Sequence, residues 1–97
     1  MELNLNKEVK SLQGEVFGKM HEMVAGYLEK ETKFDAVKLY GIAKKLMEKD
    51  GVIEIDHSDL ELLRKVFMQE NIMWNGPRAQ ILMAMDDASL NDRKEKS

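Results

Sequence analysis

The chain has 97 residues, no cysteine, a single proline and a formal net charge of −3 at pH 7. Hydrophobic residues make up 43% and charged residues 34% of it, which is typical of a globular protein with a large solvated surface and argues against a disordered chain. This length suffices for one core, so we predict a single domain over residues 1–90 and a disordered polar tail over residues 91–97. The absence of cysteine excludes disulfides, thiol nucleophiles and thiolate metal sites.

No segment has the pattern of a membrane span. The longest unbroken apolar run is Ile81-Leu82-Met83-Ala84-Met85, whereas a bilayer needs roughly 20 residues. The N-terminus also lacks the basic and apolar regions of a secretory signal. We therefore expect a cytoplasmic protein that makes no membrane contact.

The first predicted element is a short β-hairpin. Leu3, Leu5 and Val9 alternate with polar residues, and the turn is expected near Lys10–Gly14. A two-stranded hairpin is marginal alone, so a helix or a third strand must cover it. The β-branched segment 52–55 is short and alternating, and we expect it to join the hairpin as that third strand.

The two helices that follow are predicted from apolar stripes. A helix over residues 19–31 is predicted from a stripe that consists of Met20, Met23, Val24, Tyr27 and Leu28. Thr32 and Asp35 have the spacing of a variant capping box, which predicts a second helix over residues 34–49. Its stripe consists of Ala36, Leu39, Tyr40, Ala43, Leu46 and Met47.

Two more helices complete the predicted fold. Asp56 is the preferred N-cap of the third, because Ile55 and Leu60 then have the spacing of a hydrophobic staple, although Ser58 offers a competing cap. This helix is expected to end near Glu70. Pro77 opens the fourth helix, which is expected to end near Ala88.

The expected fold is therefore α+β and mostly helical, with a short N-terminal β-hairpin and a short central strand packed with about four helices. The apolar stripes and the two short strands also define the side chains expected in its core. The predicted core consists of Val24, Leu28, Leu39, Tyr40, Ala43, Met47, Ile53, Ile55, Leu60, Leu63, Phe67, Leu82 and Met85.

Motifs for metal binding or catalysis are incomplete. His21-Glu22 begins like a zinc-protease signature, but position 25 is alanine where a second histidine is required, so we expect His21 on an ordinary helix surface. The acidic segment 48–59 fails as a calcium loop in each register, because the ligand positions and the glycine do not coincide. A zinc site would need His21 and His57 to converge. We expect no enzymatic activity, no cofactor and no metal.

A nucleic-acid partner is also not expected. The connection between the second and third predicted helices includes a strand-like segment, whereas a helix-turn-helix has a turn of about 3–4 residues. The third helix begins with Asp59 and Glu61, which repel phosphate, and the net charge is negative. Lysine pairs such as Lys44-Lys45 keep a small DNA-binding transcriptional regulator as the alternative function.

Methionine carries the strongest functional indication. The chain has eight methionines, and this flexible side chain is over-used at adaptable binding surfaces. Exposed apolar residues in the segment before Pro77 would mark a contact surface, but Trp74 could equally fold back into the core. We therefore predict a non-catalytic interaction module that binds a protein partner or itself as a homo-oligomer. Its candidate contact residues are Met68, Ile72, Met73, Trp74 and Met83.

Four segments carry a resemblance to a known group. They are Leu12-Gln13-Gly14-Glu15-Val16, Ile42-Ala43-Lys44-Lys45, Val52-Ile53-Glu54-Ile55-Asp56-His57-Ser58-Asp59-Leu60, and the helix from Gly76 through Gln80-Ile81-Leu82. In this layout the chain resembles small proteins encoded in phage and prophage genomes. The resemblance implies a phage setting, such as an accessory role in assembly or host interaction, and brings no catalytic residue or cofactor. The segment around Trp74 has no counterpart in that pattern.

Overall fold

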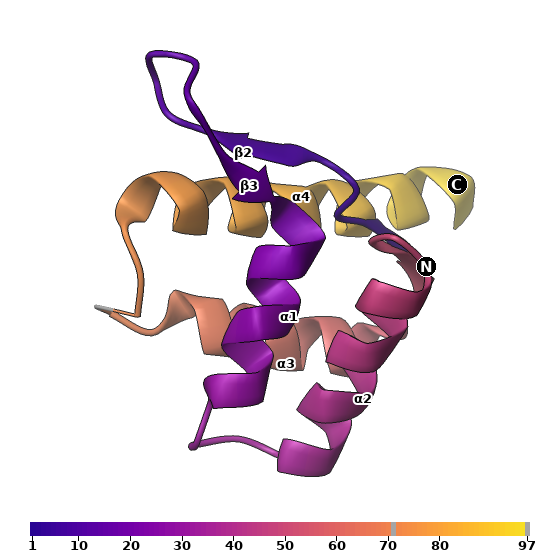
Figure 1. The fold of residues 1–97 in the computed structure, drawn as a ribbon. Coiled ribbons are helices and arrows are strands. Elements are labelled where there is room, and N and C mark those ends of the chain that lie inside the picture. The colour runs from indigo at the N-terminus through magenta and orange to yellow at the C-terminus, as the bar shows by residue number, and fades with distance from the viewer. Residues whose placement is uncertain (71, 97) are drawn as a thin grey trace.

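The computed structural model describes residues 1–70 and 72–96, the last four of these, residues 93–96, by their backbone alone. Four helices and four short strands make up this part of the chain, which confirms the predicted α+β, mostly helical class (Figure 1). In chain order they are β1 (Glu2–Asn4), β2 (Glu8–Lys10), β3 (Val16–Lys19), α1 (Met20–Lys30), α2 (Ala36–Glu48), β4 (Val52–Glu54), α3 (His57–Met68) and α4 (Asn75–Lys96).

The strands form two separate antiparallel pairs. β2 and β3 form the predicted hairpin, which projects from the body of the molecule (Figure 1). β4 pairs with β1, with Leu3 opposite Ile53, so the prediction that β4 joins the hairpin is wrong. The chain bends between the two pairs, because the Asn6 amide donates to Asn4 Oδ1 at 2.9 Å and the Lys7 amide to the Leu5 carbonyl at 2.9 Å. Because of this bend, β1 pairs with β4 while β2 pairs with β3.

Aspartates set the starts of two helices, α2 and α3. Asp56 caps α3 as predicted, since its Oδ1 accepts a hydrogen bond from the Asp59 amide at 2.7 Å. The capping box predicted at Thr32 is wrong: Asp35 itself caps α2, and its Oδ1 accepts from the Lys38 amide at 3.1 Å. The Thr32 amide instead donates to the carboxylate of Glu31, which leaves Asp35 to begin the helix.

The helices pack against one another, and α4 also packs against the first strand. α1 packs along α2, and α4 lies across the molecule against β1, β2 and α3 (Figure 1). α4 extends to Lys96, beyond the predicted end near Ala88, and includes residues 91–96 of the segment predicted as a disordered tail. Ser97 lies outside the described residues. Among the described residues, no helix combines the length and the hydropathy that crossing a membrane requires.

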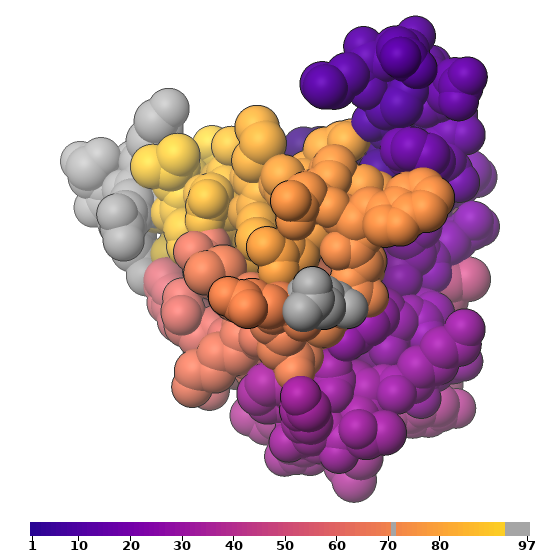
Figure 2. Space-filling model, turned by 90° about the vertical axis from the view of Figure 1, so that its left-hand side faces the viewer, coloured from indigo at the N-terminus to yellow at the C-terminus, as the bar shows by residue number. Residues whose placement is uncertain are grey.

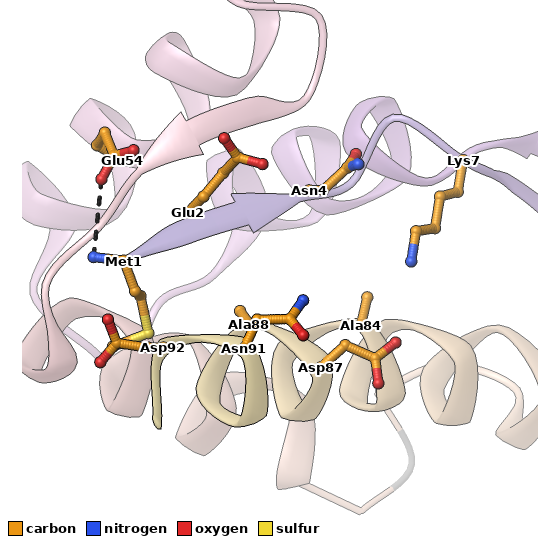
Figure 3. Close-up of a pocket in the computed structure, with 10 residues that line it drawn as sticks. All are labelled: Met1, Glu2, Asn4, Lys7, Glu54, Ala84, Asp87, Ala88, Asn91 and Asp92. Carbon is orange, nitrogen blue, oxygen red and sulfur yellow. Dashed lines mark ion pairs between the residues drawn. The ribbon is translucent and has the colours of Figure 1, made fainter. Parts of the chain in front are cut away.

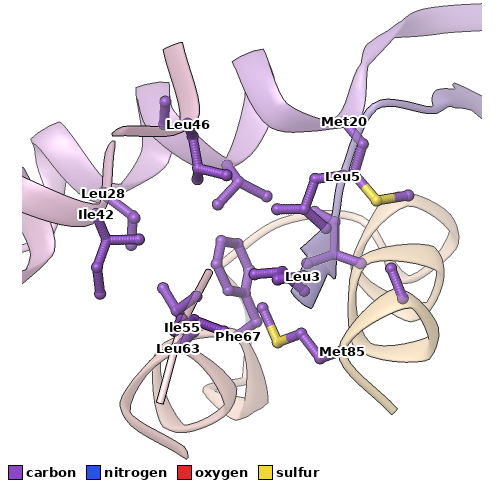
Figure 4. Close-up of a cluster of buried hydrophobic side chains, with 14 of the residues drawn as sticks. Leu3, Leu5, Met20, Leu28, Ile42, Leu46, Ile55, Leu63, Phe67 and Met85 are labelled. Atoms are coloured by element: carbon purple, nitrogen blue, oxygen red, sulfur yellow. The ribbon is translucent and has the colours of Figure 1, made fainter. Parts of the chain in front are cut away.

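The core gathers around Phe67, which is fully buried (Figure 4). Leu3 and Leu5 of the N-terminal segment reach into the same cluster as Met85 of α4, so both ends of the chain contribute to one core. The buried hydrophobic residues are Leu3, Leu5, Val9, Met20, Val24, Ala25, Leu28, Leu39, Ile42, Ala43, Leu46, Ile53, Ile55, Leu60, Leu63, Val66, Phe67, Ile81, Ala84, Met85 and Ala88.

Three predicted core residues lie elsewhere. Tyr40 is 61% exposed and Met47 half exposed, because α2 turns Ile42, rather than these two, toward the core beside Leu39 and Leu46. Leu82 is only partly buried, since the buried stripe of α4 runs through the residue before it, Ile81. Each of the three directly follows a buried residue, and is turned from it by about 100° around the helix, the angle of one residue.

Candidate functional site

Two hollows of opposite chemistry lie on the surface. The larger, the polar cleft, separates β1 from α4 and has a volume of about 800 Å³ (Figure 3). The smaller, the apolar groove, lies between α1 and the segment that joins α3 to α4, and has a volume of about 440 Å³. The polar cleft is lined by Met1, Glu2, Asn4, Lys7, Glu54, Ala84, Asp87, Ala88, Asn91 and Asp92.

The polar cleft is rich in carboxylates. Glu2 and Glu54 lie on the strand side and Asp87 and Asp92 on the α4 side (Figure 3). Two kinds of cation oppose them: Lys7, and the amino group of Met1, whose nitrogen is 3.7 Å from Glu54 Oε2. Acid–base catalysis needs carboxylates whose environments differ in a way that separates their roles, and the described lining holds no serine, threonine, cysteine or histidine beside them. The arrangement is that of a solvated charged surface.

The apolar groove combines one helix face with one connection. Figure 2 shows this side of the molecule, where the orange surface of the segment after α3 borders the purple surface of α1 and the indigo hairpin projects above it. The helix contributes both apolar and charged side chains, and the connection contributes apolar ones. The groove is lined by Glu22, Met23, Gly26, Tyr27, Lys30, Ile72, Met73, Trp74 and Pro77.

A hydrogen-bond network fixes the far end of the apolar groove. The Tyr27 hydroxyl donates to Glu31 Oε2 at 3.0 Å, and the side-chain amide of Gln69 donates to the same oxygen at 2.9 Å. Arg78 at the start of α4 donates to the Gln69 carbonyl at 2.6 Å. The network therefore ties α1, the end of α3 and the start of α4 together around the connection. The ring of Tyr27 also packs on Phe67, with ring centroids 5.3 Å apart.

The same network shifts two ionisation equilibria. Burial, followed by the hydrogen bond to Glu31 and the charge of that carboxylate, raises the pKa of Tyr27. Burial alone would raise the pKa of Glu31, but hydrogen bonds from Gln69, the Lys33 amide, Tyr27 and the Thr32 amide together outweigh it and lower that pKa. Glu31 is thus held as a carboxylate and Tyr27 as a neutral phenol at the edge of the groove.

Among the apolar residues that connect α3 to α4, Trp74 is the most exposed. It is 75% exposed, and its ring meets Phe17 of β3 edge-on at a centroid distance of 6.1 Å. Ile72 and Met73, by contrast, are half-buried against the core. Of the two alternatives left open by the sequence, Trp74 therefore does not fill the core. A contact with a partner stays a prediction.

The other candidate contact residues lie outside the apolar groove. Met68 is 59% exposed and Met83 62% exposed, and Met83 lines a smaller hollow together with Lys7, Glu8 and Met20. The groove is instead lined by Met23 and Tyr27, which the sequence assigns only to the apolar stripe of α1. The signal that could have identified them is their position at one edge of that stripe, whereas Val24 and Leu28 lie toward its other edge.

The histidines are placed differently from each other. His21 is only 5% exposed, so its expected position on a helix surface is wrong. It packs against Gly51, where a Cβ would come within 2.8 Å of His21 Cβ. His57 is exposed at the start of α3, with Nε2 3.1 Å from Asp92 Oδ2. Within the part of the chain that the structure describes, no three His, Cys, Asp or Glu side chains are grouped closely enough to hold a metal ion.

The helix pair considered for DNA binding carries neutralised cations. β4 lies between α2 and α3, so the connection is not the tight turn of a helix-turn-helix. Lys38 Nζ is 3.0 Å from Asp59 Oδ1, and that carboxylate raises the pKa of Lys38. Lys44 pairs with Glu48, and Arg64 with Asp86. These pairs weaken the attraction of this face for phosphate.

Comparison with known proteins adds no relative to this description. No protein-family model matches the chain, and no curated protein or solved structure shows significant similarity to it. Any functional proposal therefore depends on the two hollows and on the residues that build them.

Proposed function

We propose that the chain is a non-catalytic protein-interaction module that self-associates through the apolar groove. The observation that carries the proposal is the exposed indole of Trp74 beside a groove lined by Met23, Tyr27 and Met73. Aromatic and methionine side chains are enriched where proteins bind each other, and a tryptophan is the most frequent kind of residue to dominate binding energy.

The cost of leaving this surface in water supports the proposal. Burying apolar surface contributes about 25 cal/mol for each Å², so covering the exposed indole and the apolar groove beside it would add stabilisation that the monomer lacks. Large exposed apolar patches mark interaction sites on monomeric proteins. A second copy offers an apolar surface of the same kind, and it is present wherever the protein is.

The wider setting is part of the same proposal. The resemblance in layout to phage and prophage proteins supports an accessory role in assembly or in host interaction. A cytoplasmic location goes with that role. Neither point depends on the apolar groove, and each can fail without the other.

Solution mass tests self-association directly. We expect light scattering over a hundredfold range of concentration to give a mass that rises with concentration, and Trp74→Ala to weaken association at least about tenfold, as loss of a dominant contact does. The free energy of unfolding should change by less than about 1 kcal/mol, because the side chain is exposed. Tyr40→Ala is the matched control, since Tyr40 is an exposed aromatic residue of α2 outside the groove.

Three outcomes of this experiment count against the proposal. A constant monomer mass at every concentration excludes self-association. Unfolding of Trp74→Ala with unchanged association would return Trp74 to a structural role. An equal loss of association in Tyr40→Ala would place the contact outside the apolar groove.

The alternative function, a small DNA-binding regulator, has less support. Its helix pair carries lysines and an arginine that already contact carboxylates, as Lys38 contacts Asp59. Salt-dependent binding of duplex DNA at micromolar protein would favour this alternative over the interaction module.

A further inference from the structure

The outward face of α1 is complementary to itself. Glu22, Gly26 and Lys30 follow one another at intervals of four residues and are all exposed. Residues four apart form one ridge along a helix, and these three lie on the side opposite the buried Val24 and Leu28. The ridge has an acid at one end, a base at the other and a glycine midway between them.

We propose that two copies of the chain dimerise by packing α1 against α1 in antiparallel orientation about a two-fold axis at Gly26. Glu22 of each copy then pairs with Lys30 of the other, which gives two equivalent ion pairs. This inference rests on the proposed function and names the surface and the partner. Such an interface closes on itself, as the common two-fold dimers do.

The direction of packing follows from the charges. In a parallel arrangement Glu22 would face Glu22 and Lys30 would face Lys30, and like charges placed opposite each other oppose association. The antiparallel arrangement turns both repulsions into attractions. The same ridge therefore favours one orientation and disfavours the other.

Packing among the described residues of the monomer does not require a glycine at Gly26. A Cβ at this position would meet no atom within 4 Å, and glycine weakens the interior of a helix. At the centre of a helix pair, however, the absence of a side chain lets the two axes approach closely. Packing of the i±4 ridges of both helices is the commonest helix contact in globular proteins, and it would align the two Glu22–Gly26–Lys30 ridges.

Trp74 occupies a position that fits this dimer. Its ring contacts Phe17, three residues before the first residue of α1, and it lines the groove with Glu22 and Met23, so the indole lies by the N-terminal half of that helix. In the antiparallel dimer, the N-terminal half of α1 lies beside the C-terminal half of the second copy's α1, so Trp74 lies beside that C-terminal half. There the indole meets Lys30 of the second copy, and a lysine ammonium over an indole face is attractive.

Charge reversal tests the pairing in the full chain. Glu22→Lys and Lys30→Glu should each weaken dimerisation at least about tenfold, because each places like charges opposite one another twice. The double variant Glu22→Lys/Lys30→Glu restores opposite charges, and its dissociation constant should return to within about threefold of the original protein. Sedimentation equilibrium at low salt measures all four proteins.

Glycine replacement tests the approach of the helices. Gly26→Gln should weaken the dimer at least about tenfold while the melting temperature stays the same or rises, since glutamine favours a helix. Gly41→Gln in α2 is the matched control, because a Cβ at Gly41 also meets no atom within 4 Å; its dimerisation should be unchanged.

The outcomes separate this inference from the proposed function. A double charge variant that stays as weak as the single variants, or single variants that dimerise normally, would overturn the antiparallel pairing even while Trp74→Ala still weakens association. In that case the module associates through the groove in another geometry. A monomer at every concentration would overturn both.

Discussion

The polar cleft and the apolar groove differ in how they are built as well as in what lines them. The polar cleft lies beside the β1–β4 pair, where backbone hydrogen bonds hold the walls, and its carboxylates face solvent. The apolar groove is held by side chains, through Glu31, Gln69 and Arg78. The larger hollow thus presents a charged surface, while the smaller one presents surface that water solvates poorly.

The largest effect is expected just before β4, where the backbone at Gly51 lies closest to its neighbours. Gly51 has φ +90°, and a Cβ there would lie 2.9 Å from the Asn6 amide nitrogen and 2.8 Å from His21 Cβ. Gly51→Ala should therefore lower the free energy of unfolding by about 2–5 kcal/mol, from backbone strain and overpacking together. Denaturant titration measures it.

A second glycine separates the two causes. Gly14 in the hairpin turn also has a positive φ, +91°, but a Cβ there meets nothing within 4 Å. Gly14→Ala should cost only the strain, about 1–2 kcal/mol. Equal costs at the two positions would mean that the close approach to His21 is relaxed without penalty.

An intermediate effect is expected in the network at the apolar groove. Glu31→Gln removes the charge that accepts from Tyr27 and Gln69, and it should cost about 1 kcal/mol, as the loss of one charge-assisted bond at a partly exposed site does. Glu29→Gln, at an exposed glutamate of the same helix, is the control and should change stability by less than about 0.5 kcal/mol. Association should weaken with Glu31→Gln only.

The pH dependence of this network has a definite sign. Because the folded protein lowers the pKa of Glu31 below its ordinary value of 4.5, the carboxylate stabilises the fold fully above that value. The stabilisation is lost as the pH falls through the lowered folded pKa. The difference in stability between the original protein and Glu31→Gln should therefore shrink on acidification below pH 4.5. A difference that stays constant down to pH 2.5, about two pH units below an ordinary glutamate pKa, would contradict the assignment.

The smallest effect is expected in the polar cleft. Asp87 lines it as an exposed carboxylate of α4, and Asp87→Asn should alter stability by less than about 0.5 kcal/mol and leave self-association unchanged. Light scattering and thermal unfolding check both. Loss of association would move the contact surface from the apolar groove to the polar cleft and reverse the comparison.

What the sequence predicts correctly is what neighbouring residues decide. Asp56 caps α3 through an amide three residues away, and the hairpin turn is likewise closed locally, by the Ser11 amide on the Glu15 carbonyl. The pairing of β1 with β4 was missed because the competing partner, the nearer hairpin, satisfies the same alternating pattern. No short-range signal separates the two.

The apolar groove was predicted only on one side, for a similar reason. Trp74 was predicted as a contact residue from its large apolar side chain. Met23 and Tyr27 have the helical spacing of a buried stripe, and the same spacing is compatible with a position in the wall of a groove. Their role depends on the connection after α3, which is fixed by a bond between Gln69 and Glu31, residues that are 38 positions apart. Hydrophobic periodicity contains no information about such polar bonds.

The pairing of β1 with β4 also has a consequence for the order of folding. Glu2 lies opposite Glu54, so β1 cannot pair with β4 until residues 52–54 have left the ribosome. Gln80 of α4 then bonds the backbone of Lys10 in the hairpin from 70 positions away, by its Nε2 to the Lys10 carbonyl at 2.7 Å. Contacts between residues so far apart in the sequence slow folding, because the chain loses the entropy of loop closure before the contacts stabilise it. The α1–α2 pair can form early during synthesis. Leu3 and Leu5, by contrast, stay exposed to solvent until β4 and α4 have been synthesised.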